Sequence, residues 1–183
     1  MASVLVPLAQ GCEELEAVTV IDLLVRAGIE VVSAGLGPGP VRCSRGVTIL
    51  PDTTLDEALK RDFDMVVLPG GLPGADHLDA DPRIRQLLQR MAAEGKYTAA
   101  ICAAPKVLAS GGLLAGRRAT AYPGSLDGLD LPDTTVTNEA VVIDGTVITS
   151  RGPGTAMDFA LSLIEILRGH DKRAEVETAL QRP

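Results

Sequence analysis

One cysteine of this sequence stands in a setting that favours nucleophilic chemistry. Cys102 falls between an apolar run and a short helical segment, with small residues on both sides, in the stretch Ala100-Ile101-Cys102-Ala103-Ala104-Pro105. This spacing is typical of a nucleophile elbow, with sulfur in place of the usual hydroxyl. The elbow would put the sulfur at a helix N-terminus, where partial positive charge favours the thiolate. The same residues also suit a cysteine that is merely buried, so spacing alone leaves both readings open.

Three carboxyl groups open an early helical segment, and they do not look equivalent. Glu13 and Glu14 fit the ordinary pattern of acidic residues that complement the helix dipole and face water. Glu16 falls near the inner, apolar face of the same helix. A desolvated carboxyl there would stay protonated and donate a hydrogen bond to a thiolate, which makes Glu16 the candidate partner of Cys102. A surface role for Glu16 remains the alternative.

A glycine pair follows the strongest apolar run of the chain, in Leu68-Pro69-Gly70-Gly71. It forms either a simple tight turn or a set of exposed N–H groups that hold an oxyanion together with the N–H of Ala103. It does not match a phosphate-binding fingerprint, so we expect no dinucleotide cofactor.

The remaining candidates for chemistry are weaker. His77 follows the glycine pair, so a Cys–His dyad is an alternative to the Cys–Glu pair, whereas His170 lies in the C-terminal tail. Cys12 and Cys43 are interpreted as packing residues or secondary thiols. The three cysteines are odd in number and lack a CxxC spacing, which predicts free thiols, no metal site and a reducing, cytoplasmic setting.

The elements that must position these residues alternate between strands and helices. Apolar runs predict strands at residues 4–8, 29–33, 64–68 and 98–101, and helical periodicity predicts helices at residues 14–27, 54–60, 81–95, 103–110 and 155–168. Residues 40–50 read as a small excursion, and residues 141–148 as an antiparallel hairpin around Asp144-Gly145. The pattern predicts one α/β domain over residues 1–183, with a doubly wound, mainly parallel sheet. In such sheets ligands bind at the carboxyl ends of the strands, where all three candidate segments fall.

Composition excludes several classes of function. The chain has 46% hydrophobic residues but only 2% aromatic ones, which suits a core of aliphatic side chains. Its 17 basic and 24 acidic residues give a net charge of −7, which argues against general nucleic-acid binding. The N-terminus has no basic leader, and no apolar run approaches the length of a membrane span, so we expect neither export nor membrane insertion.

Four ordered motifs together resemble the ThiJ/PfpI superfamily and, within it, the protein deglycases. The motifs span the chain from first strand to last helix: Gly11-Cys12-Glu13-Glu14-Leu15-Glu16, Leu68-Pro69-Gly70-Gly71, Ala100-Ile101-Cys102-Ala103-Ala104-Pro105 and Thr149-Ser150-Arg151-Gly152-Pro153-Gly154-Thr155. The resemblance implies a flavodoxin-like homodimer without a cofactor. It also implies glyoxalase or deglycase activity on methylglyoxal and its adducts, or a role as an oxidative-stress sensor with chaperone activity.

The resemblance assigns roles to individual residues. Cys102 matches the oxidation-prone nucleophile and Glu16 the protonated glutamate beside it, with Gly70, Gly71 and Ala103 on the oxyanion side. Arg26 and Arg45 match basic residues that line the site at the dimer interface.

The sequence departs from the family pattern at two places. Some relatives have a pocket histidine before a proline, where this chain reads Ala121-Tyr122-Pro123. This weakens a cysteine peptidase mechanism and leaves Cys102 with Glu16. The charged tail at residues 169–183 differs from the apolar end of some relatives. From the elbow position we further expect the pKa of Cys102 to lie below that of an ordinary thiol.

Overall fold

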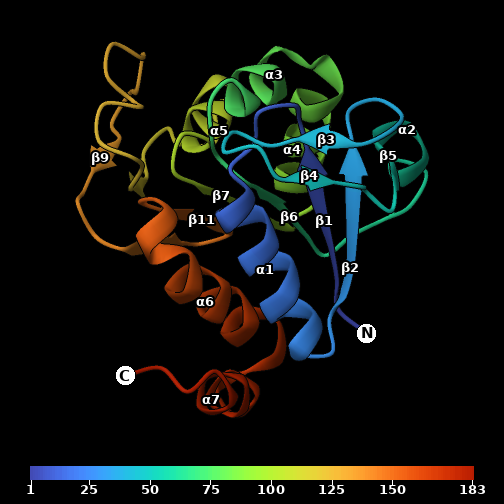
Figure 1. The fold of residues 1–183 in the computed structure, drawn as a ribbon. Coiled ribbons are helices and arrows are strands. Elements are labelled where there is room, and N and C mark those ends of the chain that lie inside the picture. Colours follow the sequence, from blue (N-terminus) through green and yellow to red (C-terminus); the bar gives the residue numbers. More distant parts are fainter.

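A seven-stranded sheet forms the centre of the molecule (Figure 1). The computed structural model describes residues 1–183. The strand order is β10-β11-β7-β6-β1-β2-β5, and every neighbouring pair is parallel except β10 with β11. The strands are β1 (Ser3–Leu8), β2 (Glu30–Gly35), β5 (Thr53–Thr54), β6 (Met65–Leu68), β7 (Tyr97–Ile101), β10 (Val141–Asp144) and β11 (Val147–Ser150). The predicted doubly wound, mainly parallel sheet is confirmed.

Helices cover both faces of this sheet, because side chains alternate between the faces along each buried strand. Val4, Val6 and Leu8 of β1 join one apolar core, and Leu5 joins the other. The first core packs under α1 (Glu14–Arg26), α6 (Ala156–Arg168) and α7 (His170–Ala179). The second packs under α2 (Leu55–Ala58), α3 (Gly74–Ala80), α4 (Pro82–Ala93) and α5 (Pro105–Ser110).

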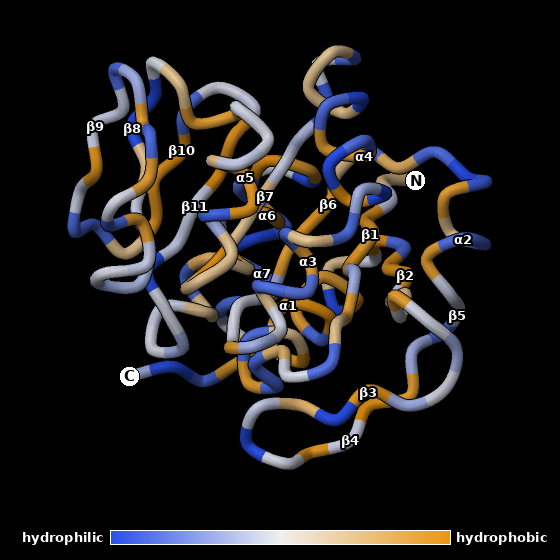
Figure 2. The backbone as a smooth tube through the Cα atoms, turned by 90° about the horizontal axis from the view of Figure 1, so that it is seen from above, coloured by the Kyte–Doolittle hydropathy of each residue, from blue (hydrophilic) through white to orange (hydrophobic).

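Two small sheets extend from this framework. The expected excursion is an antiparallel hairpin of β3 (Val41–Arg42) and β4 (Thr48–Ile49), which projects from the body of the molecule (Figure 2). A parallel pair, β8 (Arg118–Ala119) with β9 (Thr135–Val136), was not indicated by the sequence. The sequence also did not indicate α3 or α7. Helix α7 is mostly polar, packs beside α6 and contributes Val176 to the core.

The sheet brings the candidate segments to one edge. β1 and β6 pair in parallel, as do β6 and β7, so Leu8, Leu68 and Ile101 end their strands on the same side. The loops that follow these strands therefore meet there. No helix in the chain has the length and apolarity needed to cross a membrane.

Candidate active site

Cys102 lies at a strand-to-helix turn with a backbone conformation that is rare outside glycine. Its φ angle is 63°, in the left-handed region that costs an ordinary side chain conformational energy. Neighbours hold the residue there: its N–H donates to Ser150 O at 2.9 Å, and its carbonyl accepts from Tyr122 N at 2.8 Å. The backbone thus has the geometry of a nucleophile elbow, which presents the sulfur at the sheet edge.

Glu16 lies in the first turn of α1 and is 0% exposed. Its Oε2 atom accepts a hydrogen bond from Gly70 N at 2.8 Å, while Oε1 is buried without a regular hydrogen-bond partner. The polar group beside the carboxyl is the Cys102 thiol, within hydrogen-bonding reach. Burial raises the pKa of Glu16 to about 7, against the opposing effects of the Gly70 N–H and of Cys102. Glu16 therefore changes protonation near neutral pH.

The expectation of a lowered pKa for Cys102 is wrong. Burial and the adjacent Glu16 carboxyl together raise the pKa of this thiol to about 12, and the N–H groups of Gly71 and Ala103 oppose them only in part. The helix that follows has six residues, so its dipole is weaker than the cost of desolvating a thiolate. The sulfur and the carboxyl act as one coupled pair that shares a single proton above neutral pH.

The glycine pair has two separate tasks. A side chain on Gly70 would come within 2.8 Å of both Cys102 Cβ and Glu16 Oε2, so only glycine allows the two groups to approach. The Gly70 N–H is occupied by Glu16, which corrects its expected role as an oxyanion donor. The N–H groups of Gly71 and Ala103 both point toward the Cys102 sulfur. These two donors would stabilise negative charge on the sulfur or on an oxygen attached to it.

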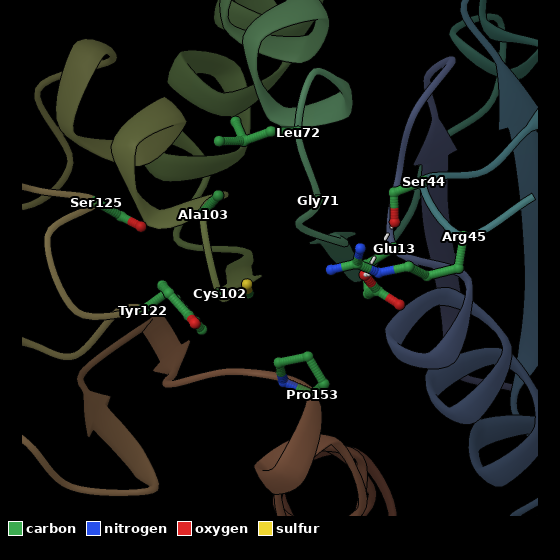
Figure 3. Close-up of a pocket in the computed structure, with 10 residues that line it drawn as sticks. All are labelled: Glu13, Ser44, Arg45, Gly71, Leu72, Cys102, Ala103, Tyr122, Ser125 and Pro153. Atoms are coloured by element: carbon green, nitrogen blue, oxygen red, sulfur yellow. Dashed lines mark hydrogen bonds and ion pairs between the residues drawn. The ribbon is translucent and has the colours of Figure 1, made fainter.

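The sulfur faces a cavity of about 350 Å³. Figure 3 shows Arg45 and Glu13 on one wall, Tyr122 and Ser125 on the other, and Cys102 between them. The Arg45 side chain is 80% exposed and lies 3.9 Å from Glu13, measured from Nε to Oε2. The cavity can thus admit a small polar molecule and offers it one cationic group. Its lining residues are Glu13, Ser44, Arg45, Gly71, Leu72, Cys102, Ala103, Tyr122, Ser125 and Pro153.

Glu13 and Glu14 are buried, contrary to the expectation that both face water. Glu13 Oε2 accepts from Ser44 Oγ at 2.9 Å. Glu14 Oε1 accepts from the N–H groups of Arg45 at 3.0 Å and Val47 at 3.2 Å. Burial alone would raise the pKa of Glu14, but these backbone donors outweigh it and lower the pKa. Both carboxylates hold the β3–β4 turn, and Glu14 supplies the acceptor that the N–H groups of Arg45 and Val47 need.

Two further basic or titratable candidates lie outside the cavity. Arg26 ends α1, far along the helix from Glu16, and pairs with Asp22 at 2.9 Å. Within one chain it does not line the pocket, so its role at a dimer interface stays a prediction. The His77 Nδ1 atom lies 2.9 Å from Gln10 O, and His77 does not line the cavity, which removes the Cys–His alternative within this chain.

The sequence did not indicate all of the residues that line the Cys102 cavity. The sequence marks Tyr122 only as a departure from a family pattern and Pro153 only as part of a motif. Leu72 and Ser125 carried no signal, because loop residues reach the site only through folding. No three His, Cys, Asp or Glu side chains converge in an arrangement that would hold a metal ion.

The fold and the site define a class: an α/β protein with a cysteine nucleophile elbow beside a buried carboxyl group. Residues 2–166 match the DJ-1/PfpI family, and the chain belongs to that family.

Named relatives extend over nearly the whole chain. It is 47% identical to protein dj-1beta of Drosophila melanogaster, over 97% of this chain and 96% of that protein. It is 39% identical to the glutathione-independent glyoxalase DJR-1.2 of Caenorhabditis elegans, over 93% of this chain and 90% of that protein. The crystal structure of Drosophila DJ-1beta superposes with a TM-score of 0.95 at 46% identity, covering 100% of this chain and 98% of that one.

Proposed function

We propose that this protein is a cofactor-independent glyoxalase and protein deglycase that acts on 2-oxoaldehydes such as methylglyoxal and on their adducts. One observation carries the proposal: the Cys102 sulfur lines a cavity sized for a small aldehyde, and the buried Glu16 carboxyl lies within hydrogen-bonding reach of that sulfur. A relative named as a glutathione-independent glyoxalase supports the reaction class. The cavity and its single arginine suit a small, polar carbonyl compound.

The first step is addition of the Cys102 sulfur to the aldehyde carbon. Glu16, whose pKa of about 7 leaves much of it ionised at neutral pH, takes the thiol proton as the C–S bond forms. The carbonyl π electrons move to oxygen, and Glu16 returns the proton to this oxygen to give a hemithioacetal. The Gly71 and Ala103 N–H groups stabilise the negative charge before that transfer.

The second step is an internal rearrangement. The Glu16 carboxylate removes the proton from the former aldehyde carbon, and the electrons move to the neighbouring carbonyl oxygen to give an enediolate. The hydroxyl proton passes to that oxygen, and Glu16 returns its proton to the neighbouring carbon as the new carbonyl forms. The product is a thioester of a 2-hydroxy acid, which water hydrolyses to the free acid and the Cys102 thiol. Carbon one is oxidised and carbon two reduced, so no external electron carrier is needed. With an adduct, the bound amine or thiol leaves with a proton from Glu16.

Product analysis tests this proposal. Purified protein and methylglyoxal in a buffer without amines or added thiols should yield lactate, detected by proton NMR, and the Cys102→Ser variant should yield none above the buffer blank. Cys43→Ser is the matched control, because it removes a buried thiol that does not line the cavity. Aldehyde loss without lactate, or equal loss in both variants, would mean simple scavenging and would reject the enzyme.

A second candidate function is oxidation sensing through Cys102. The Gly71 and Ala103 N–H groups point toward the sulfur, and a protonated Glu16 would donate to a sulfinate oxygen. A related solved structure, described as oxidised DJ-1 of Toxoplasma gondii, is 38% identical over 98% of each chain. Peroxide titration followed by intact mass separates the two roles, because a sensor gains 32 Da at Cys102 even in a variant that has lost turnover. A cysteine peptidase ranks last, since no histidine lines the cavity.

We further propose that the chain forms a homodimer through α1 and works in the cytoplasm. Leu15, Val18 and Val25 recur at helical spacing on α1 and are each about half exposed, which leaves an apolar stripe without a partner in the single chain. If a second copy packs against this stripe, Arg26 at the end of α1 also comes close to the interface, which is the position that the family resemblance implies for it. Sedimentation at micromolar concentration should give a dimer, and a Val18→Glu variant should give a monomer.

The proposed cytoplasmic location is supported by the three free thiols, which suit a reducing compartment.

A further inference from the structure

The two remaining cysteines form a second sulfur site. The Cys12 and Cys43 sulfur atoms lie 3.6 Å apart, and both residues are buried free thiols. Cys12 comes immediately before Glu13 at the start of α1, and Cys43 comes immediately before Ser44 in the β3–β4 turn. Each cysteine is therefore next in the chain to a residue that lines the Cys102 cavity, Glu13 in one case and Ser44 in the other; Figure 3 shows both of these lining residues.

The backbones that carry these two sulfur atoms are already joined. Gly11 N donates to Arg42 O at 2.8 Å, and Ser44 N donates to Cys12 O at 2.8 Å. These two bonds flank the thiol pair and keep its two strands of chain in register. A disulfide needs its sulfur atoms at about 2.05 Å, so closure requires an approach of about 1.5 Å from the observed 3.6 Å contact. The contact distance and the fixed register bring the pair within reach of a disulfide.

We propose that Cys12 and Cys43 are a redox-active dithiol that closes to an intramolecular disulfide, next in the chain to Glu13 and Ser44 of the Cys102 cavity. With a peroxide as oxidant, one thiolate attacks the peroxide oxygen and becomes a sulfenic acid, and one water leaves. The second thiolate then displaces hydroxide from that sulfur, and a second water forms. Two electrons pass from the two sulfur atoms to the peroxide, and a dithiol reductant reverses the change.

The surroundings make this pair slower to react than an exposed thiol. Burial, the facing cysteine and the Glu14 charge raise the pKa of Cys12, and burial with Glu14 and Glu13 raises that of Cys43, despite an opposing hydrogen bond from Cys12. Glu14 also fastens the turn through Arg45 N and Val47 N. Oxidation thus requires a small oxidant or a brief opening of this turn. The pair stays reduced under ordinary conditions and closes under sustained oxidation.

Formation of the Cys12–Cys43 disulfide would change the shape of the Cys102 cavity, because both cysteines are close to residues that line it. A side chain on Gly71 would lie 2.8 Å from the Cys12 carbonyl carbon and 2.4 Å from Glu13 N, so the Gly71 loop and the Cys12 backbone are tightly packed. Arg45 is two residues beyond Cys43. A shift of either cysteine would move the Arg45 wall and the Gly71 loop together. This consequence rests on the proposed function, whereas the disulfide itself does not.

The first experiment uses the Cys102→Ser variant, in which only Cys12 and Cys43 remain. The folded protein is treated with hydrogen peroxide, blocked with N-ethylmaleimide, and digested with trypsin without reduction. We expect a 2 Da loss in intact mass and a linked pair of peptides, residues 1–26 with residues 43–45, which dithiothreitol separates. Adding Cys12→Ala is the matched control and should abolish both signals. Two free, alkylated cysteines after prolonged oxidation, or a disulfide only between chains, would overturn the proposal.

The second experiment asks whether the disulfide reaches the cavity. Wild type and Cys12→Ala are oxidised in parallel, and methylglyoxal turnover is compared after the Cys102 peptide is shown by mass to carry a free thiol. We expect a several-fold loss of kcat/KM in wild type alone, restored by dithiothreitol. Equal activity in the linked and unlinked proteins would confine the disulfide to a structural role. No lactate from the untreated wild type would instead reject the proposed function and leave the first experiment valid.

Discussion

The Cys102 site and the Cys12–Cys43 pair lie on two sides of the same glycine, and all three cysteines are buried. Gly71 directs its N–H at Cys102 and packs its α carbon against the Cys12 backbone. Cys102 opens onto a cavity and has a carboxyl that can take its proton. Cys12 and Cys43 face each other, with fixed carboxylates nearby, and neither lines the Cys102 cavity.

The difference teaches that burial alone does not decide what a thiol does. Desolvation raises the pKa at all three cysteines. Only Cys102 combines a proton acceptor with access for a reactant, so only Cys102 is suited to turnover. The other two share a geometry that suits slow closure to a disulfide. The two sites therefore differ in reactivity because Cys102 has a neighbouring group that accepts its proton and a cavity through which a reactant can approach.

The largest expected effect comes from removing the proton acceptor at Cys102. Glu16→Gln keeps a polar side chain of the same shape beside Gly70 but cannot move a proton, so methylglyoxal turnover should fall by about 10²- to 10⁴-fold. Initial rates of lactate formation measure this loss, and circular dichroism checks the fold. Asp22→Asn makes the same carboxyl-to-amide change on an exposed face of α1 and should keep full activity. Wild-type turnover in Glu16→Gln would end the Cys–Glu mechanism.

The pH dependence of stability should distinguish the buried carboxyl of Glu16 from the others. Its folded pKa of about 7 lies above its ordinary value of 4.5, so the folded protein retains a proton that the unfolded chain releases between these values. The free energy of unfolding should therefore fall as pH rises from 4.5 to 7, by about 3 kcal/mol at most. Urea denaturation at several pH values measures the slope. Glu16→Gln should flatten it, and an unchanged slope would show that Glu16 is ionised throughout.

A smaller effect on stability is expected from a substitution near the Cys12–Cys43 pair. Glu14→Gln weakens the charge-assisted hydrogen bonds to Arg45 N and Val47 N, which should cost about 1–2 kcal/mol of stability. Because Glu14 has a lowered pKa, its contribution is present above the ordinary value and is lost as pH falls through the folded one. The freed turn should speed closure of the Cys12–Cys43 disulfide, followed by quenched mass spectrometry. An unchanged closure rate would show that Glu14 does not gate this pair.

Local pattern was enough to predict most of the elements near the site. Helical periodicity marks the segment that becomes α1, whose observed bounds are Glu14–Arg26, and apolar runs mark β6 and β7 to within a residue or two. Short-range preferences create these signals, so they survive in the linear chain. The glycine pair and Cys102 were also recognisable, because small residues at a strand-to-helix turn carry a local steric reason. The β8–β9 pair gave no such signal, since each strand has only two residues.

Three properties of the site depended on contacts between distant parts of the chain. Glu14 becomes a buried clamp because the turn at Arg45, about thirty positions away, offers its N–H groups. Gly70 turns its N–H to Glu16 rather than to a substrate, across 54 positions of sequence. The pKa of Cys102 rises rather than falls, because a packed core excludes the water that a thiolate needs.

The sequence by itself determined the main alternation of strands and helices, the elbow cysteine and the acidic start of α1, since each follows from neighbouring residues. Only the tertiary structure decided which carboxyl meets the sulfur, which N–H groups remain free, and that Cys12 meets Cys43 at 3.6 Å. The physical reason is that protonation and reactivity depend on dielectric, distance and access. Those quantities exist only once separate segments pack together and exclude water.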